Sequence, residues 1–184
     1  MEQSSINRLS KEEWLHRALE LFVKGGNVKL RIDSLVKSIG VTKGSFYWHF
    51  KDRKDFIVSL SKYWVDYSTL QVVDIVNQQW GNPKKCLLIL MKTVFEKDLG
   101  KYDLTMRAWA AMNPEVAKII RKTDEQRIAT VSKLFYEMGF RGEELQGRTD
   151  AFFCYMAGSH INKIKSKSEE LKHLKWKHAF FTRP

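Results

Sequence analysis

Residues 41–56 read VTKGSFYWHFKDRKDF, and this stretch carries the most information about the fold and the function. Thr42 can cap a short helix that runs through Trp48, with Phe46 and Phe50 on its inner face. The three large ring side chains after Phe46 cannot all point inward from one helix, so at least one is exposed. Basic residues follow at once. This pattern predicts a helix that packs on one side and meets base edges and phosphates on the other.

Two amphipathic helices precede this stretch. Ser10 and Glu13 can form a capping box at the start of the first helix, which Gly25 and Gly26 end. Apolar residues then recur at helical spacing over residues 32–39, and a glycine stops that second helix. Three short helices with a tight turn before the third predict a helix-turn-helix unit.

The N-terminal region resembles the DNA-binding domain of the TetR/AcrR family of bacterial transcriptional regulators. The matching residues lie at fixed offsets over about fifty positions and are Ala18, Leu21, Phe22, Gly25, Ile32, Leu35, Gly40, Val41, Thr42, Lys43, Gly44, Phe46, Tyr47, His49 and Phe50. The resemblance implies a homodimeric regulator whose helix at residues 42–48 lies in the major groove of double-stranded DNA. It also implies a C-terminal helical bundle with a small-molecule pocket and the dimer interface.

We expect nine residues to contact DNA, namely Arg31, Thr42, Lys43, Gly44, Ser45, Tyr47, Trp48, His49 and Arg53. By the resemblance, positions 42, 43 and 45 read bases, positions 47 and 49 contact phosphates, and position 48 can reach either. Gly44 leaves room for a close approach. Arg53 stands where the family usually has a phosphate-binding lysine. Arg31 replaces a capping Thr or Ser of the family, and Asp33 stands where many members have a neutral or basic residue.

The charge of the chain points to an acidic partner such as nucleic acid. Its 184 residues carry a formal net charge of +11, with a pI of about 9.6. Residues 1–54 hold eleven Lys and Arg against six Asp and Glu, and residues 161–184 hold seven against two, whereas the middle is almost neutral. The basic C-terminal end is interpreted either as a solvated helix face or as a surface that attracts an acidic partner or DNA.

The rest of the chain predicts further helices. Three prolines and ten glycines are few for this length, which disfavours a many-turned β structure. A long helix is expected from Lys51 to Trp80, and breakers divide the remainder into helices, among them one over residues 143–165. The predicted fold class is all-α, with about nine helices. Residues 1–54 are expected to form the helix-turn-helix DNA-binding domain, and residues 55–184 the ligand-binding and dimerisation bundle.

The bundle is expected to enclose a mostly apolar pocket and to form the dimer interface. The pocket candidates, each of which is also explained as plain core, are Trp64, Tyr67, Phe95, Trp109, Met112, Phe152 and Tyr155. Their bulk favours a flat or hydrophobic ligand. A dense apolar block beside small residues predicts a helix–helix dimer through Phe153, Met156, Ala157 and Gly158; the alternative is a helix buried centrally in the monomer.

Several classes of protein are disfavoured. No apolar run approaches the roughly 20 residues of a membrane span, and the N-terminus lacks a secretory stretch, so no membrane partner is expected and the cytoplasm is the expected compartment. Cys86 and Cys154 lie in apolar helical patterns and are interpreted as buried free thiols. The five histidines are scattered and no catalytic or metal-binding motif is present, so we expect neither a cofactor nor an enzyme.

The sequence therefore predicts a sequence-specific DNA-binding transcriptional regulator. We expect a repressor that releases a palindromic operator when a small, mostly apolar effector binds the C-terminal bundle. The alternative is a helical protein-interaction or structural module without DNA binding, and an enzyme ranks behind both.

Overall fold

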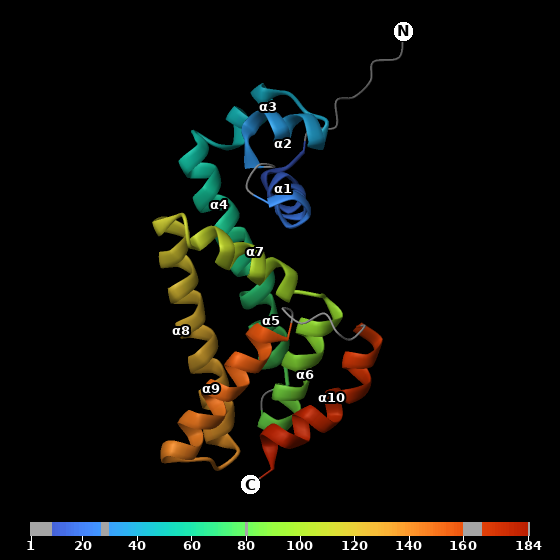
Figure 1. Cartoon of the computed structure of the whole chain (residues 1–184), viewed down its shortest axis with the longest axis vertical. Helices are drawn as coiled ribbons and strands as arrows, with labels where there is room; N and C mark the ends of the chain where they lie inside the picture. Colours follow the sequence, from blue (N-terminus) through green and yellow to red (C-terminus); the bar gives the residue numbers. More distant parts are fainter. Residues whose placement is uncertain (1–8, 27–29, 80, 160–166, 184) are drawn as a thin grey trace. The chain divides into compact units, whose positions relative to one another are not determined.

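The computed structural model describes residues 9–26, 30–79, 81–159 and 167–183, and within these ranges the chain is helical and contains no strand (Figure 1). The elements are α1 (Lys11–Gly25), α2 (Ile32–Ile39), α3 (Lys43–His49), α4 (Arg53–Val65), the π-helical turn η2 (Asp66–Leu70), α5 (Gln71–Asn77), α6 (Pro83–Glu96), α7 (Gly100–Ala110), α8 (Pro114–Glu137), α9 (Gly142–Gly158) and α10 (Lys167–Thr182). The all-α prediction is confirmed. Because α4, η2 and α5 follow one another without a break, the number of continuous helices in the described ranges agrees with the expected nine.

Local signals in the sequence begin and end these helices. Ser10 and Glu13 form the capping box of α1, with each side chain bonded to the other residue's backbone N–H. Asn82 and Asn113 cap α6 and α8 through their side-chain oxygens, and each is followed by a proline in the first turn. Gly40 ends α2 at φ 80°, a left-handed conformation that favours glycine.

Two helices and one thiol differ from the expectation. The helix expected to reach Trp80 ends at Asn77. Helix α9 ends at Gly158, and residues 160–165 of the helix expected there lie outside the described ranges. Cys86 is buried, and desolvation raises the pKa of its thiol. Cys154 is exposed, so its expected burial is wrong. The reason is that Cys154 lies on the same side of α9 as the exposed Asp150 and Ala151, away from the buried Phe152.

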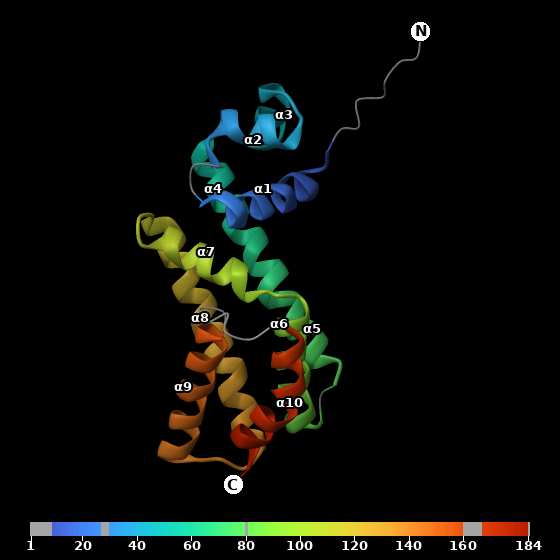
Figure 2. The ribbon, with the colours of Figure 1, turned by 45° about the vertical axis from the view of Figure 1, so that its right-hand side comes forward.

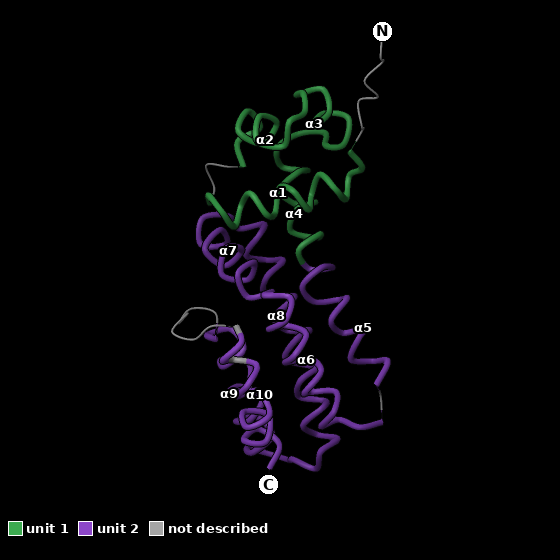
Figure 3. Tube along the Cα trace, turned by 90° about the vertical axis from the view of Figure 1, so that its right-hand side faces the viewer, with its two compact units in different colours: residues 1–64 green, residues 65–184 purple. Residues whose placement is uncertain are grey.

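The chain divides into two compact units, Met1–Trp64 and Val65–Pro184 (Figure 3). This division falls near the end of α4, ten residues beyond the boundary expected after residue 54, because α4 contributes Phe56 and other side chains to the core of the first unit. No helix among the described residues is both long enough and apolar enough to cross a membrane.

The first unit is built around four buried aromatic rings. Trp14, Phe46, Phe50 and Phe56 are each at most 1% exposed. Five pairs among them have ring centroids 5.1–5.9 Å apart in edge-on or tilted arrangements, which aromatic rings prefer. The rings come from α1, α3, the residue that follows α3, and α4. The cluster therefore joins three helices of the unit and fixes the orientation of α3.

The second unit is a bundle in which α6 has a central place. Helix α6 packs against α5, α8 and α10, and α8 also packs against α7 and α9 (Figures 1 and 2). Its core contains Leu87, Met91, Leu134, Phe135 and Phe152, each at most 1% exposed. The bundle provides the walls of the cavity described below.

Phe46→Ala should destabilise the first unit by about 3–5 kcal/mol, because it removes the ring that contacts three other aromatic residues of the core. Urea denaturation followed by tryptophan fluorescence measures the loss. The control is Tyr47→Ala, one residue further along, where a side chain that is 56% exposed is removed and the change should stay below about 1 kcal/mol. Equal losses for the two variants would contradict the assignment of Phe46 to the core.

Candidate nucleic-acid interface and ligand pocket

Helix α3 has an inner and an outer face. Residues 45, 46, 49 and 50 are buried or half-buried, whereas residues 43, 44, 47 and 48 are exposed. Tyr47 and Trp48 are 56% and 68% exposed, which is unusual for such large rings. Within each set, the residues recur in adjacent pairs four positions apart, which places them on one side of an α-helix. The two sets therefore occupy opposite sides of α3. The exposed set is the outer face of α3 and is the candidate nucleic-acid interface.

Two of the nine residues expected to contact DNA form hydrogen bonds within the first unit. The indole Nε1–H of Trp14 donates a hydrogen bond to Ser45 Oγ at 3.0 Å. His49 Nε2 lies 2.8 Å from the carbonyl oxygen of Leu9, so this ring nitrogen donates and carries the proton. Both side chains are half-buried. Ser45 and His49 therefore hold α3 against the N-terminal segment of the unit.

The side chains at the start of α3 are ordered by local contacts. Thr42 caps the helix, with its Oγ1 accepting the backbone N–H of Ser45 at 3.3 Å. Lys43 Nζ lies 2.7 Å from an Asp33 carboxylate oxygen, and this contact raises the pKa of the lysine. Both side chains are well exposed, so the ion pair orients Lys43 but neutralises its charge only weakly.

The remaining expected DNA contacts are also at the surface of the first unit. Arg31 precedes α2 and makes no side-chain cap hydrogen bond, and Arg53 begins α4; both are exposed. Gly44 is exposed as well, and a Cβ at this position would have ordinary contact with Thr42 Oγ1 at 3.5 Å. No clash inside the chain requires a glycine at position 44, so its lack of a side chain leaves space only toward an outside partner.

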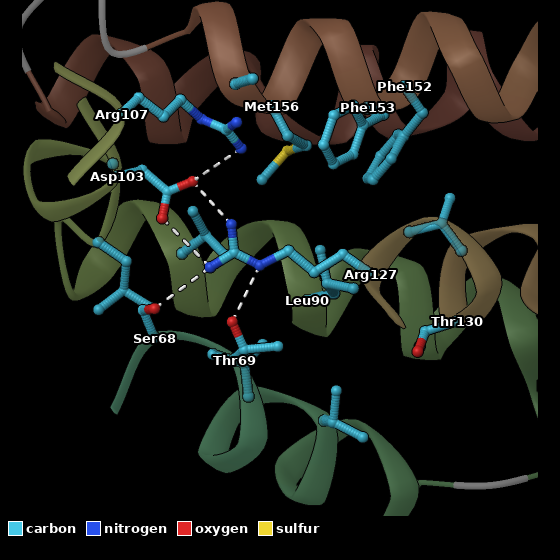
Figure 4. A pocket seen from close by; sticks show the side chains of 17 residues that line it. Ser68, Thr69, Leu90, Asp103, Arg107, Arg127, Thr130, Phe152, Phe153 and Met156 are labelled. Atoms are coloured by element: carbon cyan, nitrogen blue, oxygen red, sulfur yellow. Dashed lines mark hydrogen bonds and ion pairs between the residues drawn. The ribbon is translucent and has the colours of Figure 1, made fainter. Parts of the chain in front are cut away.

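The second unit contains a cavity of about 90 Å³ with mostly apolar walls (Figure 4). Its described lining residues are Ser68, Thr69, Val72, Val73, Leu90, Val94, Leu99, Gly100, Asp103, Arg107, Arg127, Thr130, Val131, Phe152, Phe153, Met156 and Ala157. They come from η2, from helices α5 to α9 and, at Leu99, from the residue before α7. A mostly apolar cavity with a few convergent polar groups is the usual form of a small-molecule site.

Arg127 connects three elements at the polar end of the cavity. Its guanidinium donates to both Asp103 oxygens, at 2.7 and 3.1 Å, and reaches Thr69 Oγ1 at 2.9 Å and Ser68 Oγ at 3.2 Å. Figure 4 shows this group between Asp103 and the two hydroxyls, with Phe152, Phe153 and Met156 on another wall. Arg127 thereby joins α8 to α7 and to the π-helical turn η2.

A second arginine completes a group of four charges. Arg107 donates to both oxygens of Asp124, at 2.7 and 2.8 Å, and its Nη2 lies 3.6 Å from Asp103 Oδ2. The hydrogen bonds that Arg107 donates to Asp124 raise the pKa of Arg107 further, so this side chain stays charged. Asp103, Arg107, Asp124 and Arg127 form the charge cluster, with two positive and two negative members whose side chains are 16–32% exposed.

The expected pocket residues only partly coincide with this cavity. Phe152 lines it. Trp64, Phe95 and Trp109 are buried elsewhere, and Tyr67 and Tyr155 are half-buried beside other aromatic rings. Met112 is 73% exposed, because it lies in the turn that follows α7. These six residues do not line the cavity.

Three of the four expected dimer residues lie on the cavity side of α9. Phe153, Met156 and Ala157 line the cavity, and Gly158, which is half-buried, ends the helix. The apolar block of α9 therefore packs toward the interior of the bundle, as in the alternative interpretation of a helix buried within the monomer.

Asp103, Arg107 and Arg127 line the cavity although the sequence did not predict them there. A signal was present for Arg127, which occupies a position in the apolar stripe of α8 between Ile120 and Val131. A charge in such a stripe needs a partner inside the fold. Its partners are distant in the sequence, so the stripe alone does not identify them. Among the described residues, no cluster of three or more His, Cys, Asp or Glu side chains could hold a metal ion.

The fold and the outer face of α3 define a protein of the helix-turn-helix class, and comparisons with known proteins agree. Residues 15–60 match the family of bacterial regulatory proteins of the tetR family. The uncharacterized HTH-type transcriptional regulator YerO of Bacillus subtilis (strain 168) is 30% identical over 78 residues, which are 42% of this chain and 27% of that protein. The chain thus spans about a quarter of the length of this curated relative.

Solved structures share the fold over nearly the whole chain. A transcriptional regulator from Rhodococcus sp. Rha1 has a TM-score of 0.76 at 17% identity, covering 95% of this chain and 94% of its own. A regulator from Saccharomonospora viridis, solved in complex with choline, has a TM-score of 0.71 at 16% identity, covering 90% and 93%. Residues 15–60 thus carry the tetR-family match, and the resemblance to the TetR/AcrR family predicted from the sequence is confirmed. The family consists of regulatory proteins, which are not enzymes.

Arg127→Met should destabilise the second unit by roughly 3 kcal/mol, because it leaves the Asp103 carboxylate without its bidentate partner in a poorly solvated place. Combining it with Asp103→Leu should restore much of the loss, since both charges are then removed together. Chemical denaturation of the single and double variants measures this coupling. The control is Arg121→Met at an exposed position of α8, with an expected change within about 0.5 kcal/mol. Additive losses in the double variant would contradict the coupling.

Proposed function

We propose that this protein is a sequence-specific DNA-binding transcriptional regulator that acts as a homodimer in the cytoplasm. We further propose that it is a repressor, released from a palindromic operator by a small effector. The observation that carries the proposal is the outer face of α3, where Tyr47 and Trp48 are exposed beside Lys43 on a helix whose other face is firmly packed. Large exposed rings next to a basic group suit a DNA surface.

The contacts of the first unit support different roles for the nine residues expected to contact DNA. Thr42, Lys43 and Gly44 are the groups proposed to meet base edges, and Tyr47, Trp48 and the arginines at positions 31 and 53 the groups proposed to reach phosphates or bases. Ser45 and His49 already make contacts within the unit, so their proposed role is to position α3. The family match over residues 15–60 supports the same docking of α3 in the major groove.

The geometry of DNA supports the proposed homodimer. One α3 reads only a few base pairs, and two copies can occupy successive major grooves when they lie about 34 Å apart on a palindrome. The surface of α10 supports a dimer contact, because Trp176 and Phe180 are 67% and 63% exposed and stack with ring centroids 6.0 Å apart. Exposed apolar patches of this kind commonly mark protein interfaces.

The cavity supports control by an effector. Ser68 and Thr69 line it and belong to η2, which continues α4 along the chain without a break. A π-helical turn is less stable than an α-helical one, and here Arg127 holds two of its side chains. A ligand that alters these hydrogen bonds would change η2 and, through the continuous helix, the domain that α4 supports. Such a ligand must prefer one arrangement over the other, or nothing shifts.

The full-length protein should select a palindromic sequence from a random DNA library and bind it with nanomolar affinity that falls steeply between 50 and 200 mM salt. Tyr47→Ala should weaken this binding roughly tenfold, because the ring is exposed on the outer face of α3. Fluorescence anisotropy measures the affinity.

The matched control is Tyr136→Ala, which removes a tyrosine of similar exposure from α8 and should leave DNA affinity unchanged. Denaturation of each variant separates loss of binding from loss of folding. If the library yields no enriched sequence and binding shows no salt dependence, the chain is a helical interaction module instead.

Replacing both Trp176 and Phe180 by Ala should shift the protein from dimer to monomer, because their stacked rings form the exposed apolar surface of α10. Analytical ultracentrifugation at micromolar concentration measures the association. Exchange of two exposed polar residues of the same helix, Lys172 and His173, for Ala is the control and should leave the dimer intact. A dimer that survives removal of both rings would place the interface elsewhere.

A further inference from the structure

The charges of the side chains at the polar end of the cavity cancel one another. Among the described lining residues, the charged ones are Asp103, Arg107 and Arg127. Asp124 adds a second carboxylate through its two hydrogen bonds to Arg107. Each guanidinium in the charge cluster therefore has a carboxylate held in bidentate geometry, and the cluster has no net formal charge.

An ionic ligand would disturb this balance. An anion that took the place of Asp103 on Arg127 would leave that carboxylate with only the longer contact of 3.6 Å to Arg107. A cation that paired with Asp103 would set its charge beside two guanidinium groups. In both cases one charge remains uncompensated in a place where the side chains are 16–32% exposed, and such a charge is costly.

An uncharged oxygen fits the same place without this cost. The hydrogen bonds of Arg107 to Asp124 use two of its five guanidinium donors, and Arg107 lines the cavity. The Thr130 hydroxyl, which also lines the cavity, donates to its own helix at Gln126 and retains acceptor capacity. The other walls, among them Val72, Leu90 and Phe153, offer only apolar contact.

We propose that the cavity binds an uncharged, largely apolar molecule that carries one polar oxygen, and that the neutrality of the charge cluster excludes anions and cations of the same shape. This inference rests on the proposed effector function and adds the chemical class of the ligand. It names Arg107 and Asp124 as the residues that determine charge specificity, although Asp124 does not line the cavity. The ligand's oxygen binds near Arg107, and its apolar body fills the space between α5, α6 and α9.

The test uses the full-length protein and two sets of matched probes, with one and with two aromatic rings. The first set is benzyl alcohol, benzoate and benzylammonium; the second is 2-naphthalenemethanol, 2-naphthoate and 2-naphthylmethylammonium. Titration calorimetry at pH 7 measures the Kd of each probe. In at least one set, the alcohol should bind at least tenfold more tightly than both ions. If an ion binds as tightly as the alcohol or more tightly in both sets, the inference is wrong.

Asp124→Asn changes the charge of the cluster to +1 and leaves the cavity wall in place. It should tighten binding of the carboxylate probe at least tenfold and change that of the alcohol less than twofold. Glu125→Gln is the matched control, since it removes the same charge from the next, exposed position of α8 and should alter no affinity. An unchanged preference in Asp124→Asn would overturn the role of the charge cluster.

If circular dichroism shows that Asp124→Asn does not fold, Arg107→Met takes its place as the test. This variant changes the charge of the cluster in the opposite direction. It gives the cluster a charge of −1 and should tighten binding of the ammonium probe at least tenfold. Release of operator DNA is measured with the same probes in parallel. If an ion binds best and releases DNA, the inference fails and the proposed function stands. If no probe binds at millimolar concentration, both the ligand class and the effector part of the proposed function fail.

Discussion

A helix of seven residues is not stable alone in water, so α3 exists only because its inner face is buried. Phe46, together with Phe50 just beyond the helix end, supplies that face by packing against Trp14 and Phe56. Once these two rings are inside, helical spacing forces Tyr47 and Trp48 outward. The same packing that stabilises the helix therefore determines which side chains a partner can reach. The hydrogen bond from Trp14 to Ser45 fixes the rotation of α3 about its own axis.

In the second unit, two arginines lie next to a mostly apolar cavity. Burial of a charge is costly unless it is paired and hydrogen-bonded. Arg127 meets this condition through four hydrogen bonds to three residues, and Arg107 through two to Asp124. The result is a polar end whose charges are all paired and which has no net charge. In the proposed function, ligand selectivity and the structure of η2 therefore both depend on the charge cluster.

The sequence predicted those features that depend on neighbouring residues. The caps at Ser10 and Thr42 act over three residues, and apolar spacing of three and four defined the helices. It did not predict contacts between distant segments. Trp14 meets Ser45 across 31 positions, and His49 meets Leu9 across 40, so the inward orientation of Ser45 and His49 was not visible. The apolar pattern of α9 favoured a dimer contact, but the same block also suits the interior of the bundle, where three of its residues line the cavity.

The cavity shows most clearly why the candidate site was only partly predictable. Aromatic bulk pointed to Phe152, yet bulky residues such as Phe95 and Trp109 fill the core and leave no space. The space lies beside residues of small or medium size, such as Val72, Val94 and Ala157, and beside the charge cluster. Arg127 reaches Thr69 across 58 positions.

In the proposed mechanism, the hydrogen bond between Arg127 and Thr69 lets the ligand and the DNA influence the same continuous helix. Because such coupling is reciprocal, an effector that weakens operator binding must itself bind less tightly to the DNA complex, by the same factor.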